Sequence, residues 1–175
     1  MKKLPFPLLL LLPALALGSP IENPKSQSEN LPSPAPANAH CSNLTAAPDG
    51  TLHLTYYGPA APSAPVVNPA VRALWHATLA PGATAFSSPR PIVTTPLLME
   101  NWADFASLAV GTDGALTAQW FQKTGPDAHG YDGWYSRSDD AGRTWRTPAS
   151  LGHEFVVLAP LSQGRTLAVW LESTR

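Results

Sequence analysis

The chain has 175 residues, and its 11 Lys and Arg nearly balance its 12 Asp and Glu, which leaves a formal charge of −1 at pH 7. Proteins that bind nucleic acid through its phosphates need clustered positive charge, so this composition argues against a nucleic-acid partner. The 20 prolines, 12 glycines and six tryptophans, set among short β-branched or aromatic runs, predict an all-β domain with many turns.

The first 18 residues have the three parts of a secretory signal peptide. Lys2 and Lys3 give a positive start, residues 8–17 are mostly apolar, and small residues precede Ser19. Pro13 interrupts the apolar stretch, which is too short to span a bilayer, so we expect no membrane span in the mature chain. The sequence therefore predicts export to the periplasm or the extracellular space, with an uncleaved N-terminal anchor as the alternative.

Residues 19–41 are predicted to form a linker. They are rich in Pro, Ser, Asn and Ala and have few large apolar side chains, so burial could not offset the entropy lost on ordering. One β domain is expected to follow, over residues 42–175. Cys41 is the single cysteine of the chain and is interpreted as a small buried hydrophobic residue at the start of a strand.

Three segments of this domain repeat a pattern in which a glycine heads a strand and an aromatic residue follows six positions later. The glycines at positions 50, 114 and 164 are 64 and 50 residues apart, and a Pro-rich loop at 58–69 lengthens the first interval. A four-stranded propeller blade takes ~40–50 residues. The pattern therefore predicts about two blades and the start of a third.

A second motif lies between two strand-like segments at residues 138–145. Its pattern S-x-D-x-G-x-T-W is formed by Ser138, Asp140, Gly142, Thr144 and Trp145. The aspartate can accept hydrogen bonds from its own turn, the glycine supplies a positive φ, and the tryptophan buries a large ring. A weaker copy at residues 74–86 keeps the turn and the aromatic residue but lacks the acid.

This motif resembles the Asp-box of sialidases (neuraminidases) and other BNR-repeat β-propellers, and the resemblance covers residues 42–175. It implies a partial β-propeller of four-stranded antiparallel blades, similar to an exo-alpha-sialidase. Propellers close with ~4–8 blades. We therefore expect the sequence to be the N-terminal part of a longer protein; a complete small β protein or an oligomerising half-ring is the alternative.

Counting back ten residues from the three glycines gives His40, Asp104 and Glu154, at the expected mouth of the central channel. Asp104 and Glu154 are candidates for the general acid and the base or nucleophile of a glycosidase. Trp102 is the candidate stacking platform for a sugar, and His153 a further substrate contact. Capping of loop backbone and packing between blades is the alternative role for these side chains.

The resemblance to sialidases fails at one informative place. In that family an R-I-P arginine binds the carboxylate of sialic acid, and here its position falls near Asp104; the E-G-R position reads Phe121-Gln122-Lys123. An acid in place of the arginine would repel sialic acid. The acid/base aspartate of the family lies before the Asp-box, where this chain has Asp127 and Asp132, which turn chemistry also explains.

The sequence leaves two candidate functions besides a purely structural scaffold. The first is an exported glycoside hydrolase of exo-alpha-sialidase type that acts on glycans. The second is a non-catalytic propeller that binds glycan or protein at the cell envelope. No cofactor motif is present, and His53, His76 and His129 lack the spacing of metal ligands, so no metal or cofactor is expected. The glycosylation sequon at Asn43 is interpreted as chance.

Overall fold

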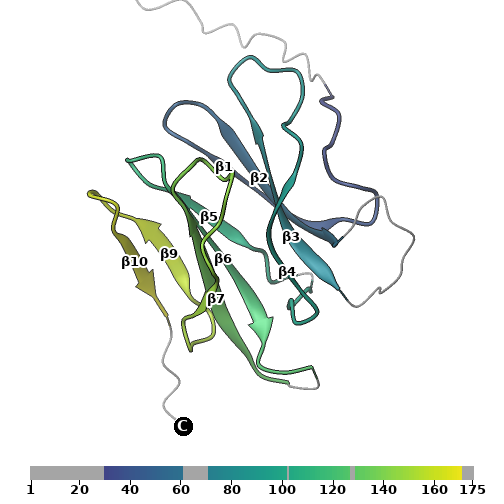
Figure 1. Ribbon diagram of the computed structural model, residues 1–175, viewed down its shortest axis with the longest axis vertical. Coiled ribbons are helices and arrows are strands. Elements are labelled where there is room, and N and C mark those ends of the chain that lie inside the picture. The colour runs from purple at the N-terminus through teal and green to yellow at the C-terminus, as the bar shows by residue number, and fades with distance from the viewer. Residues whose placement is uncertain (1–29, 61–70, 102, 127–128, 171–175) are drawn as a thin grey trace, which may run out of the picture. The chain divides into compact units, whose positions relative to one another are not determined.

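The computed structural model describes residues 30–60, 71–101, 103–126 and 129–170 (Figure 1). The chain divides into the units Met1–Asn30 and Leu31–Arg175, and the second is described below. The predicted signal peptide (1–18), Trp102 and Asp127 lie outside the described residues. Across the described ranges, no helix is long and apolar enough to cross a membrane.

The second unit is all-β, as predicted, with ten strands and no helix among its described residues. Two four-stranded antiparallel sheets, each in sequential order, are followed by a two-stranded sheet (Figure 1). This order of sheets is the one expected for successive propeller blades. The strands are β1 (His40–Ala46), β2 (Leu52–Pro59), β3 (Arg72–Leu79) and β4 (Arg90–Thr95); β5 (Ser107–Val110), β6 (Leu116–Lys123), β7 (Tyr131–Ser138) and β8 (Ala149–Ser150); and β9 (Val157–Pro160) and β10 (Thr166–Val169).

The three repeated glycines occupy equivalent turns. Gly50, Gly114 and Gly164 have φ angles of 85°, 77° and 68°, and each lies two residues before the second strand of its sheet. Only glycine adopts this region without steric cost, which explains why the repeats align on it. The predicted strand heads are therefore confirmed at all three positions.

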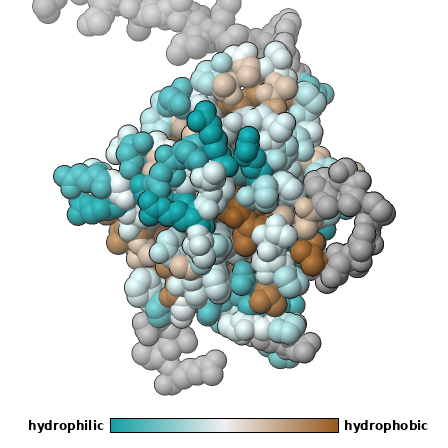
Figure 2. Space-filling view, in the orientation of Figure 1, coloured by the Kyte–Doolittle hydropathy of each residue, from teal (hydrophilic) through white to brown (hydrophobic). Residues whose placement is uncertain are grey.

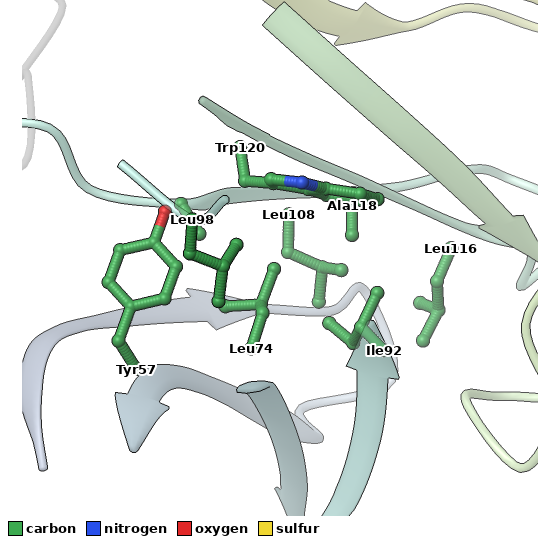
Figure 3. Packing of buried hydrophobic residues seen from close by; sticks show 9 residues of the cluster. Tyr57, Leu74, Ile92, Leu98, Leu108, Leu116, Ala118 and Trp120 are labelled. Carbon is green, nitrogen blue, oxygen red and sulfur yellow. The ribbon is translucent and has the colours of Figure 1, made fainter. Parts of the chain in front are cut away.

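The two four-stranded sheets pack against each other through a buried apolar interface. Tyr57 and Leu74 extend from the first sheet toward Leu116 and Trp120 of the second (Figure 3). Trp120 has 0% of its surface exposed. Full burial of one such side chain stabilises the fold by ~1.5–3 kcal/mol, so this interface is a main source of stability.

The first strands of successive sheets are neighbours: β1 contacts β5, and β5 contacts β9. The Asn43 Nδ2 atom donates to the Ala106 carbonyl at 2.9 Å, and the Thr45 hydroxyl donates to the Leu108 carbonyl at 3.3 Å. These strands therefore have the placement of innermost propeller strands. Asn43 is the sequon asparagine, and its amide nitrogen is already engaged at this junction.

The opposite face of the first sheet is covered by residues from the predicted linker. Ala35 and Ala39 pack against Tyr56 and Trp75, and the Tyr56 hydroxyl donates to the Pro34 carbonyl at 3.5 Å. Alanine loses almost no side-chain entropy on burial, so these small residues can cover the face at little cost. The sheet begins at His40, within the segment 19–41.

The turn at residues 138–145 has the hydrogen bonds that its sequence predicts. The Asp140 carboxylate accepts from the Thr144 backbone at 2.8 Å and from the Thr144 hydroxyl at 2.6 Å. The Ser138 hydroxyl donates to Asp140 and accepts from the Gly142 N–H, both at 2.8 Å. Trp145 packs against the interface between the sheets. The turn is therefore closed locally and anchored to the core.

Gly142 is required by both backbone and packing. Its φ is 83°, and an added Cβ would lie 2.3 Å from the His76 ring. We expect Gly142→Ala to lower the free energy of unfolding by ~1–2 kcal/mol from the strained φ and by a further ~1–3 kcal/mol from overpacking. Chemical denaturation followed by tryptophan fluorescence measures this loss.

Gly82→Ala is the matched control, because Gly82 has a φ of 74° but nothing within 4 Å of an added Cβ. It should show the loss from backbone strain alone. Equal losses in the two variants would contradict the contact between Gly142 and His76.

The Asp140 hydrogen bonds predict a dependence of stability on pH. Bonds from the Thr144 hydroxyl and backbone, and then from Ser138, lower the pKa of Asp140 to about 2. A carboxylate with a depressed folded pKa stabilises the fold above its ordinary pKa, and this contribution is lost as pH falls from about 4 to about 2. The melting temperature of the wild type should therefore fall more steeply over this window than that of Asp140→Asn. An equal fall in melting temperature for the two proteins over this window would show that Asp140 contributes nothing to the pH dependence of stability.

Candidate functional site

The strands β1, β5 and β9 start at one end of the sheets, here called the strand-start end. Residues 97–99 pair with the far part of β6, through Met99 N–H to Phe121 O at 3.0 Å and Lys123 N–H to Leu97 O at 2.8 Å. β5 then pairs with the earlier part of β6, from Leu116 to Gln119. Residues 100, 101 and 103–106 therefore lie outside the sheet edge, in a segment here called the excursion.

Asp104 lies on this excursion and is held by Asn101. The Asn101 Oδ1 atom accepts from the N–H groups of Ala103 at 2.7 Å and Asp104 at 2.9 Å, and its Nδ2 donates to the Asp104 carboxylate. Such turns are typical of asparagine, whose side chain bonds the backbone two or three residues ahead. The half-buried carboxylate of Asp104 is thus fixed in place.

Asp104 and Glu154 both raise the pKa of Tyr131. The pKa of the Tyr131 phenol is raised, first by burial and then by the negative charges of Asp104 and Glu154. Two carboxylates 50 residues apart in the sequence therefore influence the same phenol at the strand-start end. Tyr131 was not singled out from the sequence; its place at the opening of β7, after a loop, is the signal that could have identified it.

Aromatic rings gather beside this phenol. Phe121 contacts Tyr131 edge-on with ring centroids 5.5 Å apart, and Phe155, which is 53% exposed, lies 6.2 Å from Tyr131. His153 stacks on Trp170 with centroids 4.6 Å apart. On the face seen in Figure 2, hydrophobic residues reach the surface in small patches between hydrophilic ones. Exposed rings near carboxylates are suited to stack on a sugar while the carboxylates bind its hydroxyls.

A paired arginine lies at the same end of the first sheet. Arg72 Nε donates to both carboxylate oxygens of Glu100, at 3.1 and 3.2 Å, and His40 Nε2 lies 2.6 Å from Oε2 of the same carboxylate. The Cys41 thiol donates to the Asn101 carbonyl at 3.0 Å, and burial, followed by Glu100 and Asp104, raises its pKa. Cys41 is half-buried in β1, close to its interpretation from the sequence. The Arg72 guanidinium is therefore already paired with the Glu100 carboxylate.

The opposite end of the sheets, here called the hairpin end, contains a histidine pair that sequence reasoning missed. His53 Nδ1 and His76 Nε2 are 3.0 Å apart, and both rings are buried, at 5% and 3% exposure. Burial and then the His53 charge lower the pKa of His76 to about 4, and burial also lowers that of His53. The two residues are 23 positions apart, and only the β2–β3 register brings them together.

The candidate residues thus fall into two groups. Asp104, Glu154 and His153 lie at the strand-start end, whereas the motif at 138–145 lies at the hairpin end. Within the described ranges, no group of three or more His, Cys, Asp or Glu side chains could hold a metal ion.

No protein-family model and no curated protein matches the chain. Among solved structures, the chain is similar to the Hadza microbial sialidase Hz136, with a TM-score of 0.45 and 14% sequence identity. The match covers 70% of this chain and 29% of that one, so the chain spans less than a third of that protein's length. This distant similarity concerns the fold alone.

Proposed function

We propose that this chain belongs to a glycan-directed β-propeller of sialidase-like type, and that its strand-start end acts as a glycoside hydrolase. The observation that supports this most is that Asp104 and Glu154 both raise the pKa of Tyr131, whose ring contacts the exposed Phe155. A pair of carboxylates and a stacking surface are the parts that glycoside hydrolysis needs. Trp102 and Asp127, outside the described residues, remain part of the proposed set.

In this proposal the two carboxylates have different surroundings and different roles. Asp104 is half-buried and bonded to Asn101, which suits a fixed base or nucleophile, whereas Glu154 is exposed. One of the two would donate a proton to the leaving group, and the other would act as base or nucleophile. The face carries negative charge and its Arg72 is paired with Glu100, so a neutral sugar fits it better than the carboxylate of a sialoside.

The test is hydrolysis of 4-methylumbelliferyl glycosides, a sialoside beside neutral hexosides. We expect Asp104→Asn and Glu154→Gln each to reduce kcat by ~10²–10⁴-fold, the usual contribution of a general acid or base. Asp139→Asn is the control, since Asp139 is exposed at the hairpin end, where it pairs with Arg137 and Arg146. Full activity in both carboxylate variants would refute their catalytic role.

A non-catalytic glycan-binding role is the second candidate, and one observation favours it. The Asp104 carboxylate is engaged by Asn101, which is how a loop cap behaves. In that case the protein is inert on every glycoside but is retained on a glycan column, and Phe155→Ala weakens retention by removing an exposed ring. Retention that is unchanged in this variant would exclude binding through the aromatic surface.

We also propose that the chain is exported, on the strength of residues 1–18. Expression in a bacterial host should yield a mature protein that begins at Ser19 and is found in the periplasm or the medium, as intact mass and cell fractionation would show. Leu10→Arg should retain the precursor inside the cell, because it places a charge in the apolar segment. Recovery of an uncleaved wild-type chain in the membrane pellet would instead support the N-terminal anchor.

A further inference from the structure

A cavity of about 580 Å³ lies at the hairpin end, away from the proposed glycoside site. Its walls come from both four-stranded sheets: the turn before β2, the β3–β4 hairpin, the turn before β6, and residues 141–143. His53 and His76 line it together with the hydroxyl side chains of Thr51, Ser88 and Thr112. A concave site with a few buried polar groups is the usual form of a small-molecule pocket.

The roles of the two histidines in their hydrogen bond depend on where their protons lie. The Gly142 backbone packs closely against the His76 ring and raises the pKa of His76, against the lowering by burial and by His53. His76 Nε2 is the atom that faces His53. With its proton on Nδ1, a neutral His76 accepts the hydrogen bond from His53 at Nε2.

The same reasoning extends to His53. In that tautomer of His76, His53 donates from Nδ1 and keeps an unprotonated Nε2. No described residue hydrogen-bonds that Nε2, and the His53 side chain is 5% exposed and lines the cavity. A hydroxyl or N–H donor from a ligand in the cavity can hydrogen-bond this nitrogen.

The charged residues of the lining favour an anion. Arg90 and Arg143 line the cavity, and neither forms an ion pair with any described residue. The carboxylate in the lining is Asp49, which accepts from the Thr51 N–H at 2.9 Å. Two arginines against one aspartate leave a net positive lining, and guanidinium groups are well matched to carboxylate and phosphate oxygens.

We propose that this cavity is a binding site for a small hydroxylated organic anion, such as a sugar acid. A ligand hydroxyl donates to His53 Nε2, and Arg90 and Arg143 bind the carboxylate or phosphate. In this arrangement His76 accepts from His53 Nδ1, which leaves His53 Nε2 as the acceptor for the ligand. This site is independent of the glycoside hydrolase proposed above, because the two lie at opposite ends of the strands.

Titration of the full chain with D-glucuronate at pH 7 tests this proposal, with ¹⁵N NMR of the imidazole nitrogens as the readout. We expect His53 Nε2 to resonate as an unprotonated nitrogen in the free protein and to shift as glucuronate binds. Glucose, which lacks the charge, and acetate, which lacks the hydroxyls, should each bind at least tenfold more weakly. Glucuronate binding no tighter than either control, or a proton on His53 Nε2, would overturn the proposal.

Substitutions at the exposed residues Arg90 and Arg143 test the site without disturbing the core. Arg143→Gln and Arg90→Gln should each raise the Kd for glucuronate about tenfold, the loss expected for one charged hydrogen bond. Arg165→Gln, which removes an exposed arginine that does not line the cavity, should leave the Kd unchanged. Equal affinity in Arg143→Gln, Arg90→Gln and the wild type would show that the arginines do not bind the anion and would reject the site.

Discussion

The buried interface between the two four-stranded sheets fixes the position of every other part of the fold described above. A sheet in water must cover one face, and here Tyr57 and Leu74 of the first sheet cover Trp120 of the second. Side chains of β1 also donate to backbone carbonyls of the segment around β5, which sets the two innermost strands in register. Once the sheets are fixed in this way, the starts of their inner strands share one end and the tight hairpins share the other.

The two ends have different chemistry because different kinds of backbone form them. At the strand-start end, the excursion lies outside the sheet and contains Asp104, whose charge raises the pKa of Tyr131. At the hairpin end, glycine turns bring backbone close to side chains of the sheet, and a histidine pair is buried between them. One fold thus offers an acidic, partly exposed surface and a positively charged cavity on the same pair of sheets.

The turn at residues 138–145 links stability to this cavity. Its Asp140 and Ser138 close the turn through local hydrogen bonds, and its Gly142 approaches the His76 ring more closely than any larger residue could. The glycine that permits the turn therefore also packs against the buried histidine. From the sequence, the motif at residues 138–145 is explained by turn formation alone. In the folded chain, its residues 141–143 also line the cavity.

Features that depend on residues close together in the sequence could be predicted, because only a few neighbouring positions determine them. They are the all-β class, the hydrogen bonds of Asp140, and the turns at Gly50, Gly114 and Gly164. Which distant side chains meet depends on the tertiary structure. The pairing of His53 with His76 follows from strand register, and the influence of Asp104 and Glu154 on the pKa of Tyr131 follows from the packing of separate sheets. Neither leaves a periodic signal in the sequence, since each depends on how separate strands are placed rather than on local backbone preference.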